Sequence, residues 1–308
     1  MMLERRSNFP KQLRFPGEEF QPGSIVVSAS RRTELVGLRP EWLVSALQRF
    51  ERRYKREIHS VVLWTKDPTN IYENKELREE LSKYNLLVHF TLTGLGGTRI
   101  EPTVPEPEVL LQRMPRLLAF LEDSRRLRWR FDPIVTLEKE DKTHWSSSVY
   151  FESLAQQMAQ YGIDNCYFSF CSMYPKIAAR KLERSGIKMI TPSAGEQLEV
   201  VEQMKNIAAP LGTTLYSCVQ PLLENVSGIT PAKCIDAELL TELHPEKLPA
   251  DQNRDKTQSK YREACYCTES RDIGAYLACG HGCVYCYAEA AVPIPGKLIQ
   301  KPMPYPKT

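Results

Sequence analysis

Short runs of β-branched and aromatic residues alternate with longer stretches in which apolar residues recur at helical spacing. The short runs predict six strands, over residues 24–30, 60–65, 86–92, 127–131, 166–170 and 213–218. The longer stretches predict helices over residues 40–53, 73–84, 108–122 and 147–161, and one that begins near residue 193. Ser193 and Glu196 have the spacing of a capping box at the start of that last helix.

Six strand–helix units predict a parallel sheet with right-handed crossovers. We therefore expect an α/β fold, built as a TIM-like (β/α)6-type partial barrel. A doubly wound sheet is the alternative, because element order alone does not separate the two. The expected division is an N-terminal extension (1–22), the (β/α) barrel (23–243), an irregular cysteine-rich segment (244–290) and a Pro-rich tail (291–308).

Polar residues gather where the predicted strands end, and in parallel α/β folds the site lies at the carboxyl ends of the strands. These residues are Ser28, Ser30, Arg31 and Arg32; Trp64, Thr65, Lys66 and Asp67; Thr91 and Thr93; Arg130 and Asp132; Ser169; and Gln220. We expect Arg31, Lys66 and Arg130 to bind an anionic substrate, and Asp132 to act as a base or orient a cation. The competing interpretation is internal ion pairing, of Arg130 with Asp132 or of Lys66 with Asp67.

The chain has 308 residues, 42% of them hydrophobic, which suffices for a large core. Its net charge of +3 gives no general argument for a nucleic-acid or membrane partner. No apolar run approaches the ~18 residues of a membrane span, and the first residues lack the apolar stretch of a secretory signal. We therefore expect a cytoplasmic protein with no membrane partner, whose nine cysteines serve metal or redox chemistry.

Three cysteines near the end of the sequence, Cys279, Cys283 and Cys286, are spaced so that one loop turns three thiolates toward one point. Three thiolates suit three corners of a [4Fe-4S] cluster and leave the fourth iron open for chemistry. Zinc is the alternative, because similar spacings serve tetrahedral zinc sites. A fourth zinc ligand would come from His281 or from a second cysteine pair, although we favour His281 as an ordinary loop residue.

Four other cysteines are candidates for a second site. Cys265 and Cys267 are one residue apart, Cys218 ends the sixth predicted strand, and Cys234 begins the string Cys-Ile-Asp. We predict that they meet as a second iron-sulfur cluster or a zinc site. In the alternative, Cys218 is a core residue and the close pair only braces a loop. Cys166 and Cys171 flank the fifth strand and are expected to be core thiols.

The aromatic Tyr285 just before Cys286 makes this loop resemble the cluster loop of radical S-adenosylmethionine (SAM) enzymes. The resemblance implies that SAM binds the open iron and is cleaved reductively to start hydrogen abstraction from a small-molecule substrate. It also implies a reducing partner such as flavodoxin or ferredoxin, and a place for Tyr285 near the adenine. The superfamily's loop follows the first strand, whereas this one follows the last. No Gly-Gly-Glu string is present, and we predict that the backbone at Thr93, Gly94 and Gly96 replaces it.

Several separate strings resemble domain-of-unknown-function family 1848, described as carrying a radical-SAM-like cysteine cluster at its C-terminus. They are Ser28-Ala29-Ser30-Arg31-Arg32-Thr33, Trp64-Thr65-Lys66-Asp67-Pro68, Trp129-Arg130-Phe131-Asp132-Pro133-Ile134, Cys234-Ile235-Asp236 and Asp272-Ile273-Gly274-Ala275-Tyr276. The resemblance covers about residues 24–288 and implies an iron-sulfur segment without implying a substrate.

Two other functions compete with a radical SAM enzyme. The first is a zinc-stabilised barrel that binds or hydrolyses a phosphorylated ligand. The second is a nucleic-acid repair lyase, because Tyr285-Cys286-Tyr287-Ala288 is similar to the loop of spore photoproduct lyases. Basic runs at residues 52–56 and 125–128 would suit nucleic acid, but we favour solvated helix ends for them.

Overall fold

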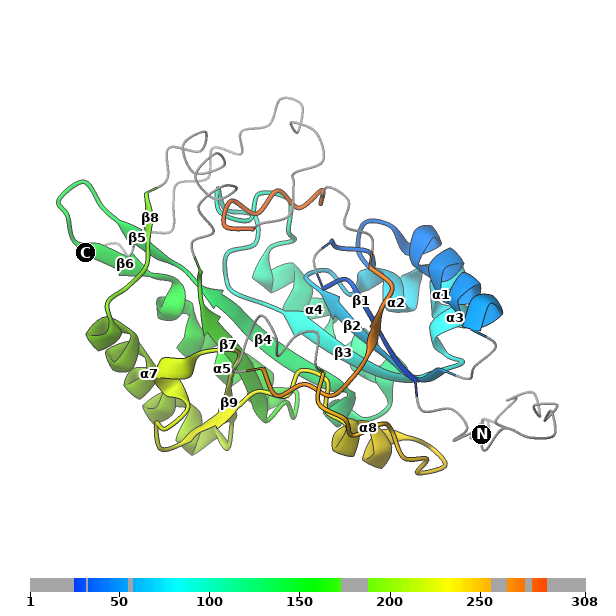
Figure 1. Cartoon of the computed structure of the whole chain (residues 1–308). Helices are drawn as coiled ribbons and strands as arrows, with labels where there is room; N and C mark the ends of the chain where they lie inside the picture. Colours follow the sequence, from blue (N-terminus) through cyan, green and yellow to red (C-terminus); the bar gives the residue numbers. More distant parts are fainter. Residues whose placement is uncertain are drawn as a thin grey trace.

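The structure is a computed structural model and describes residues 25–31, 33–54, 58–172, 188–255, 265–274 and 279–286. The expected N-terminal extension (1–22) and Pro-rich tail (291–308) lie outside the described residues, as does Arg32. In the described residues, an eight-stranded sheet in which all neighbours are parallel organises the chain (Figure 1). The expectation of an α/β fold with a parallel sheet is confirmed.

All six predicted strands are present in the large sheet. They are β1 (Ile25–Ala29), β2 (Ile58–Thr65), β3 (Asn85–Thr91), β4 (Leu127–Ile134), β7 (Asn165–Phe170) and β9 (Thr214–Ser217). Two more strands were not predicted, β10 (Ile229–Pro231) and β11 (Arg271–Asp272), because runs of three and two residues carry no periodic signal. A separate antiparallel sheet joins β5 (Thr136–Glu138), β6 (His144–Ser146) and β8 (Met189–Ile190).

The strands of the large sheet follow one another in chain order. From β1 the order runs through β2, β3, β4, β7 and β9 to β10, while β11 lies on the other side of β1. From β1 to β10 the strand order therefore runs in one direction across the sheet. A doubly wound sheet would instead contain a point at which the strand order reverses. The carboxyl ends of consecutive strands are neighbours, so residues that follow them in sequence come together in space.

Seven helices occur in the described parts of the chain. They are α1 (Pro40–Tyr54), α2 (Thr69–Glu73), α3 (Lys75–Leu81), α4 (Pro107–Leu121), α5 (Phe151–Gln160), α7 (Ala194–Ala208) and α8 (Ala237–Leu243). The helix predicted over 73–84 is wrong in detail: Asn74 is extended, and its side chain caps α3 after α2 has ended. Ser193 and Glu196 form the predicted capping box of α7. None of these seven helices is long and apolar enough to cross a membrane.

The two faces of the sheet pack against different partners. On the outer face, Val61, Trp129 and Phe168 belong to one large core with residues of α1, α3, α4, α5 and α7. On the inner face, Val62 and Tyr167 pack with α8 and with residues 232–235, 265 and 267. Because strand side chains alternate between faces, neighbouring residues of one strand meet these two environments in turn. In Figure 1, the orange chain that leads into β11 and the gold helix α8 lie in front of the sheet, whereas α4 and α5 lie behind it.

Candidate functional site

The loop of residues 279–286 lies beside the loop that follows β3. Val284 N donates to Ile100 O at 3.0 Å, and the Thr103 hydroxyl donates to Gly280 O at 3.0 Å. Figure 1 shows the two loops side by side above the sheet, the first in red-orange and the second in cyan-green. The cysteine loop therefore lies over the carboxyl ends of the first strands, where parallel sheets have their sites.

Glu101 is a buried carboxylate beneath this loop, and its side chain is only 2% exposed. It accepts hydrogen bonds from Lys66 Nζ (2.9 Å), Thr93 Oγ1 (2.9 Å) and the Tyr285 hydroxyl (2.5 Å). These three donors come from the end of β2, the loop after β3 and the cysteine loop. Glu101 thus joins three segments of the site, although no motif or spacing in the sequence pointed to it.

Lys66 pairs with Glu101, so it forms an internal ion pair as the competing interpretation had it, but not with Asp67 as that interpretation suggested. Asp67 instead accepts a hydrogen bond, at 3.1 Å, from the backbone N–H of Thr69, the first residue of α2. Burial lowers the pKa of Lys66, but the negative charges of Glu101 and Cys283 more than offset this and raise it overall. The ammonium is therefore retained beside a cysteine of the loop.

Glu34 is a second buried carboxylate that sequence reasoning missed. It accepts from Thr65 Oγ1 (2.9 Å), Lys66 N (2.7 Å) and Gly37 N (3.0 Å), and its Oε2 lies 3.5 Å from His281 Nε2. Burial raises the pKa of Glu34, whereas His281 and the backbone N–H donors lower it, and the net direction is down. A negative charge is therefore stable at the point where β1, β2 and the cysteine loop meet.

The three cysteines of the loop differ in exposure. Cys283 is buried and faces Lys66, whereas Cys279 and Cys286 are half-buried. Burial raises the pKa of Cys283 and of Cys279, and Lys66 opposes this at Cys283. Cys171, expected to be a core thiol, is buried in the same apolar cluster as Cys283, and burial raises its pKa to about 12.

Across the described ranges, no group of three or more His, Cys, Asp or Glu side chains is arranged so that it could hold a metal ion. A [4Fe-4S] cluster makes a different demand, because each thiolate binds a different iron and the sulfurs stand apart. Three thiols on one short loop, with the Lys66 ammonium within electrostatic reach of one of them, are the kind of donors that such a cluster uses.

Arg130 and Asp132 form an ion pair at the end of β4, as the competing interpretation had it. Ser169 donates to the same carboxylate. Arg130 is buried, and its Nη1 also donates to Cys234 Sγ at 3.2 Å. Its guanidinium thus bridges a carboxylate and a thiol of the chain itself, which leaves it less free to bind a substrate.

An aromatic row lines the inner face next to this pair. The Arg31 guanidinium lies 5.1 Å above the Trp64 ring, and Trp64 stacks on His89 with ring centroids 4.8 Å apart. Burial and the positive charge of Arg130 hold the pKa of His89 well below its usual value, so this ring is neutral. Arg31 Nη2 donates to Ser270 Oγ at 2.8 Å, whereas its buried Nε has no hydrogen-bond partner among the described residues.

The four remaining candidate cysteines come together on the inner face. Cys218 Sγ lies 3.6 Å from Cys234 Sγ. Cys267 interacts with both Cys234 and Cys265. The structure thus brings the four residues near one another in a row of pairwise contacts, but among the described residues no three of them surround one point as a metal site would require. By contrast Cys166, on the outer face, is a fully buried core thiol, as expected.

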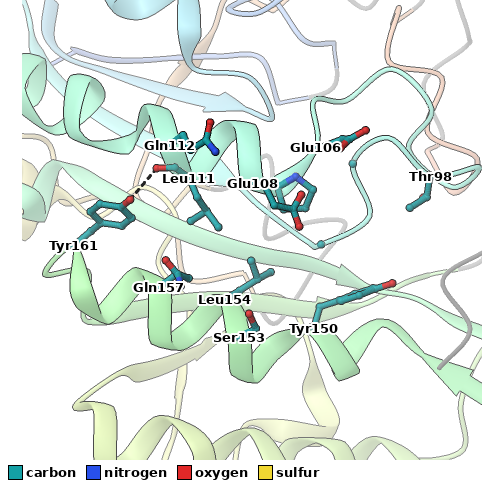
Figure 2. Close-up of a pocket in the computed structure, with 13 residues that line it drawn as sticks. Thr98, Glu106, Glu108, Leu111, Gln112, Tyr150, Ser153, Leu154, Gln157 and Tyr161 are labelled. Carbon is teal, nitrogen blue, oxygen red and sulfur yellow. Dashed lines mark hydrogen bonds between the residues drawn. The ribbon is translucent and has the colours of Figure 1, made fainter. Parts of the chain in front are cut away.

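Of the residues predicted to stand in for a SAM-binding string, Thr93 binds Glu101, whereas Gly94 and Gly96 border a different feature. With residues of α4 and α5 they line a hollow of about 660 Å³ (Figure 2). Figure 2 shows Tyr150, Gln157 and Tyr161 opposite Leu111, to whose carbonyl Tyr161 donates at 2.9 Å. A Cβ on Gly96 would lie 2.1 Å from Pro105 O, so close backbone packing is reason enough for this glycine.

The basic run at residues 125–128 is used within the chain. Arg126 donates to Asn85 Oδ1 at 2.7 Å and to Leu243 O at 2.6 Å, which ties β3 to α8. Arg125 pairs with Asp123 at 2.8 Å. Part of the other basic run, residues 55 and 56, lies outside the described residues. Arg125 and Arg126 thus serve as helix-end and strand contacts, whereas the buried Nε of Arg128 has no hydrogen-bond partner among the described residues.

Comparison with known families supports the resemblance drawn from the short strings. One family model matches residues 26–288, and its description is "Domain of unknown function (DUF1848)". A search of curated proteins gave no match. The matched range includes both cysteine groups and both buried carboxylates.

Proposed function

The chain belongs to domain-of-unknown-function family 1848, and from the geometry of its site we propose that it is an iron-sulfur enzyme of the radical SAM type. Cys279, Cys283 and Cys286 would hold a [4Fe-4S] cluster. The observation that carries the proposal is the seating of this loop over the carboxyl ends of β1 to β3, where Val284 and Tyr285 bind the loop after β3 and His281 lies beside Glu34. The site lies where parallel α/β enzymes hold their cofactors.

We infer further that the sheet is an open (β/α) barrel. Its strands follow in chain order, and β11 lies beside β1, where the last strand of a barrel belongs. In such a barrel the inner face becomes the wall of a central space, and the cysteine loop lies at its mouth. The inner face packs an apolar cluster with α8. It also carries buried polar groups such as His89 and Arg130, which supports a site on that side of the sheet.

When bound, such a cluster supplies the electron for reductive cleavage of SAM, which a small reducing partner such as flavodoxin or ferredoxin would deliver. The protein's own residues hold and screen this centre. Lys66 offsets the thiolate charge at Cys283, and Glu101 fixes Lys66 and Tyr285 in place. Glu34 holds the Lys66 backbone and faces His281. These contacts keep the loop rigid and exclude water from the Cys283 side.

Arg31 is the best candidate to bind an anionic group of a small-molecule substrate. It lies over Trp64, and its Nε is buried with no partner within the described part of the chain. Arg130 and Asp132 would instead position the inner wall, since they already bind each other and Arg130 binds Cys234. A guanidinium that keeps free donors suits a carboxylate or phosphate.

The test is the iron and sulfide content of the full chain after anaerobic reconstitution, with electron paramagnetic resonance (EPR) of the reduced protein before and after SAM is added. We expect about four iron from this loop and an EPR signal that SAM alters. Cys283→Ser should lose that iron, and Cys166→Ala, a buried thiol on the outer face, should keep it.

Two results would count against the proposal. A chain that takes up no iron would exclude the cluster. A fully loaded cluster whose signal ignores SAM, with no SAM cleavage, would exclude the radical SAM assignment and leave an iron-sulfur protein of another kind.

A further inference from the structure

The four cysteines of the inner face come from three separate segments. Cys218 follows β9, Cys234 precedes α8, and Cys265 and Cys267 belong to the irregular segment 265–274. Cys234, Cys265 and Cys267 are buried, and Cys218 is half-buried. Local sequence patterns do not bring four thiols from distant parts of a sequence together inside an α/β core. Their proximity therefore needs an explanation of its own.

The irregular segment is held on the sheet mainly by backbone bonds, among them the pairing of β11 with β1 and the bond from Ile273 N to Ser28 O at 2.9 Å. Within residues 265–274 only Cys265, Cys267 and Thr268 are buried. Backbone bonds give it a register, with Thr268 N donating to Ile235 O and Asp255 N donating to Cys267 O, each at 2.9 Å. A segment that buries so little apolar surface usually depends on a cross-link through metal or sulfur.

A buried cation lies beside these thiols, where it would offset part of the negative charge of metal-bound thiolates. Arg130 Nη1 lies 3.2 Å from Cys234 Sγ, and a cation at that distance stabilises negative sulfur. The 3.6 Å between the sulfurs of Cys218 and Cys234 suits two ligands of one ion. Tetrahedral zinc with Zn–S bonds of about 2.3 Å separates its sulfurs by roughly 3.8 Å. A cubane cluster would place each sulfur on a different iron, further apart.

We propose that Cys218, Cys234, Cys265 and Cys267 bind one zinc ion, which clamps the irregular segment to the inner face of the sheet. In the described structure the four sulfurs form a row, with Cys234 and Cys267 in the middle. Zinc binding would draw Cys218 and Cys265, the two ends of the row, inward to complete the tetrahedron. The site is separate from the loop at residues 279–286 and does not depend on a cluster there.

The experiment measures zinc, iron and acid-labile sulfide in the full chain and in matched variants. Wild type should hold about one zinc per chain. Cys234→Ser with Cys267→Ser should lose it while keeping the iron of the loop. The triple change Cys279→Ser, Cys283→Ser and Cys286→Ser should lose that iron and keep the zinc. Cys166→Ala should keep both, as a control for the loss of a buried thiol.

A second measurement covers the case in which the paired variant folds poorly. Zinc is removed from the wild-type chain by a chelator and replaced with cobalt(II), whose tetrahedral thiolate complexes absorb strongly in the near ultraviolet. We expect that absorption, together with slower hydrogen exchange in residues 265–274 when metal is present. Three results would overturn the proposal: no metal held by these cysteines, iron and sulfide lost with them in place of zinc, or a Cys218–Cys234 disulfide in the purified chain.

Discussion

The two faces of the large sheet are built from the same strands but by different interactions. On β4, Trp129 points outward into packed aromatic rings, while its neighbour Arg130 points inward to Asp132 and Cys234. On β7, Phe168 is outward and Tyr167 inward. The outer face is stabilised by the burial of apolar side chains, and such a core leaves little room for charged groups. The inner face keeps charges and thiols out of water, a costly arrangement that proteins reserve for chemistry or binding.

The elements that pack on the two faces of the sheet also differ. Helices with apolar stripes seal the outer face, whereas α8 and the irregular segment cover the inner one. A helix can fold from local preferences and amphipathic pattern. An irregular segment with three buried residues depends on specific contacts. We therefore expect stability to reside in the outer face, and sensitivity to metal, oxidation and ligands to reside in the inner one.

The largest effect should come from the outer face. Trp129→Ala removes a fully buried ring that stacks on Phe151 and donates to Leu92 O at 3.0 Å. We expect the free energy of unfolding to fall by about 3–5 kcal/mol, measured by urea denaturation. Leu198→Ala, on an exposed part of α7, is the control and should change it by less than about 0.5 kcal/mol. Equal losses in the two variants would contradict the account of the outer core.

On the inner face, Arg130→Met should lower the free energy of unfolding somewhat less than Trp129→Ala does. Asp132 would keep its hydrogen bond from Ser169, and its side chain is one-fifth exposed to water. We expect a loss of about 3 kcal/mol in the free energy of unfolding, caused by the carboxylate that is left without its cation. Adding Asp132→Asn to this variant should restore part of the loss. If the double variant were as unstable as the sum of the two single variants, the ion pair would not be the source of the effect.

The smallest effect should come from a local signal at the start of α7. Ser193 Oγ accepts from Glu196 N, and Glu196 Oε2 accepts from Ser193 N at 2.7 Å. Ser193→Ala should lower the free energy of unfolding by about 1 kcal/mol, seen as a modest drop in melting temperature. Ser193→Asp keeps an oxygen acceptor and should behave like wild type. A drop as large as that of Trp129→Ala would mean that this end of α7 does more than cap a helix.

Most of the fold could be predicted because its signals are local. Apolar runs of four to eight residues placed the six long strands, and the spacing of Ser193 and Glu196 placed the start of α7. The edge strands β10 and β11 could not be predicted, since each exists only because a neighbour offers its backbone. The break between α2 and α3 was missed, because Asn74 ends one helix and caps the next within a continuous apolar pattern.

In the candidate site, too, the residues with a local sequence signal could be predicted and those without one could not. Spacing alone identified Cys279, Cys283 and Cys286, because ligands of one loop must lie close in sequence. Glu34 and Glu101 have no such signal, and their importance comes from partners on other segments, such as Lys66 and Tyr285. The meeting of Cys218 with Cys234 was predicted only as one of two alternatives, since sixteen residues and a strand separate them.

The sequence by itself determined the parallel α/β class, the long strands and helices, and the presence of a thiol-rich loop. Each follows from periodicity or spacing within a few residues. Only the tertiary structure decided which carboxylate pairs with Lys66, which thiols lie in contact, and which residues of the loop after β3 bind the cysteine loop. These outcomes depend on strand order and on the alternation of faces, which join residues far apart in the sequence, such as Glu101 and Tyr285, 184 positions apart.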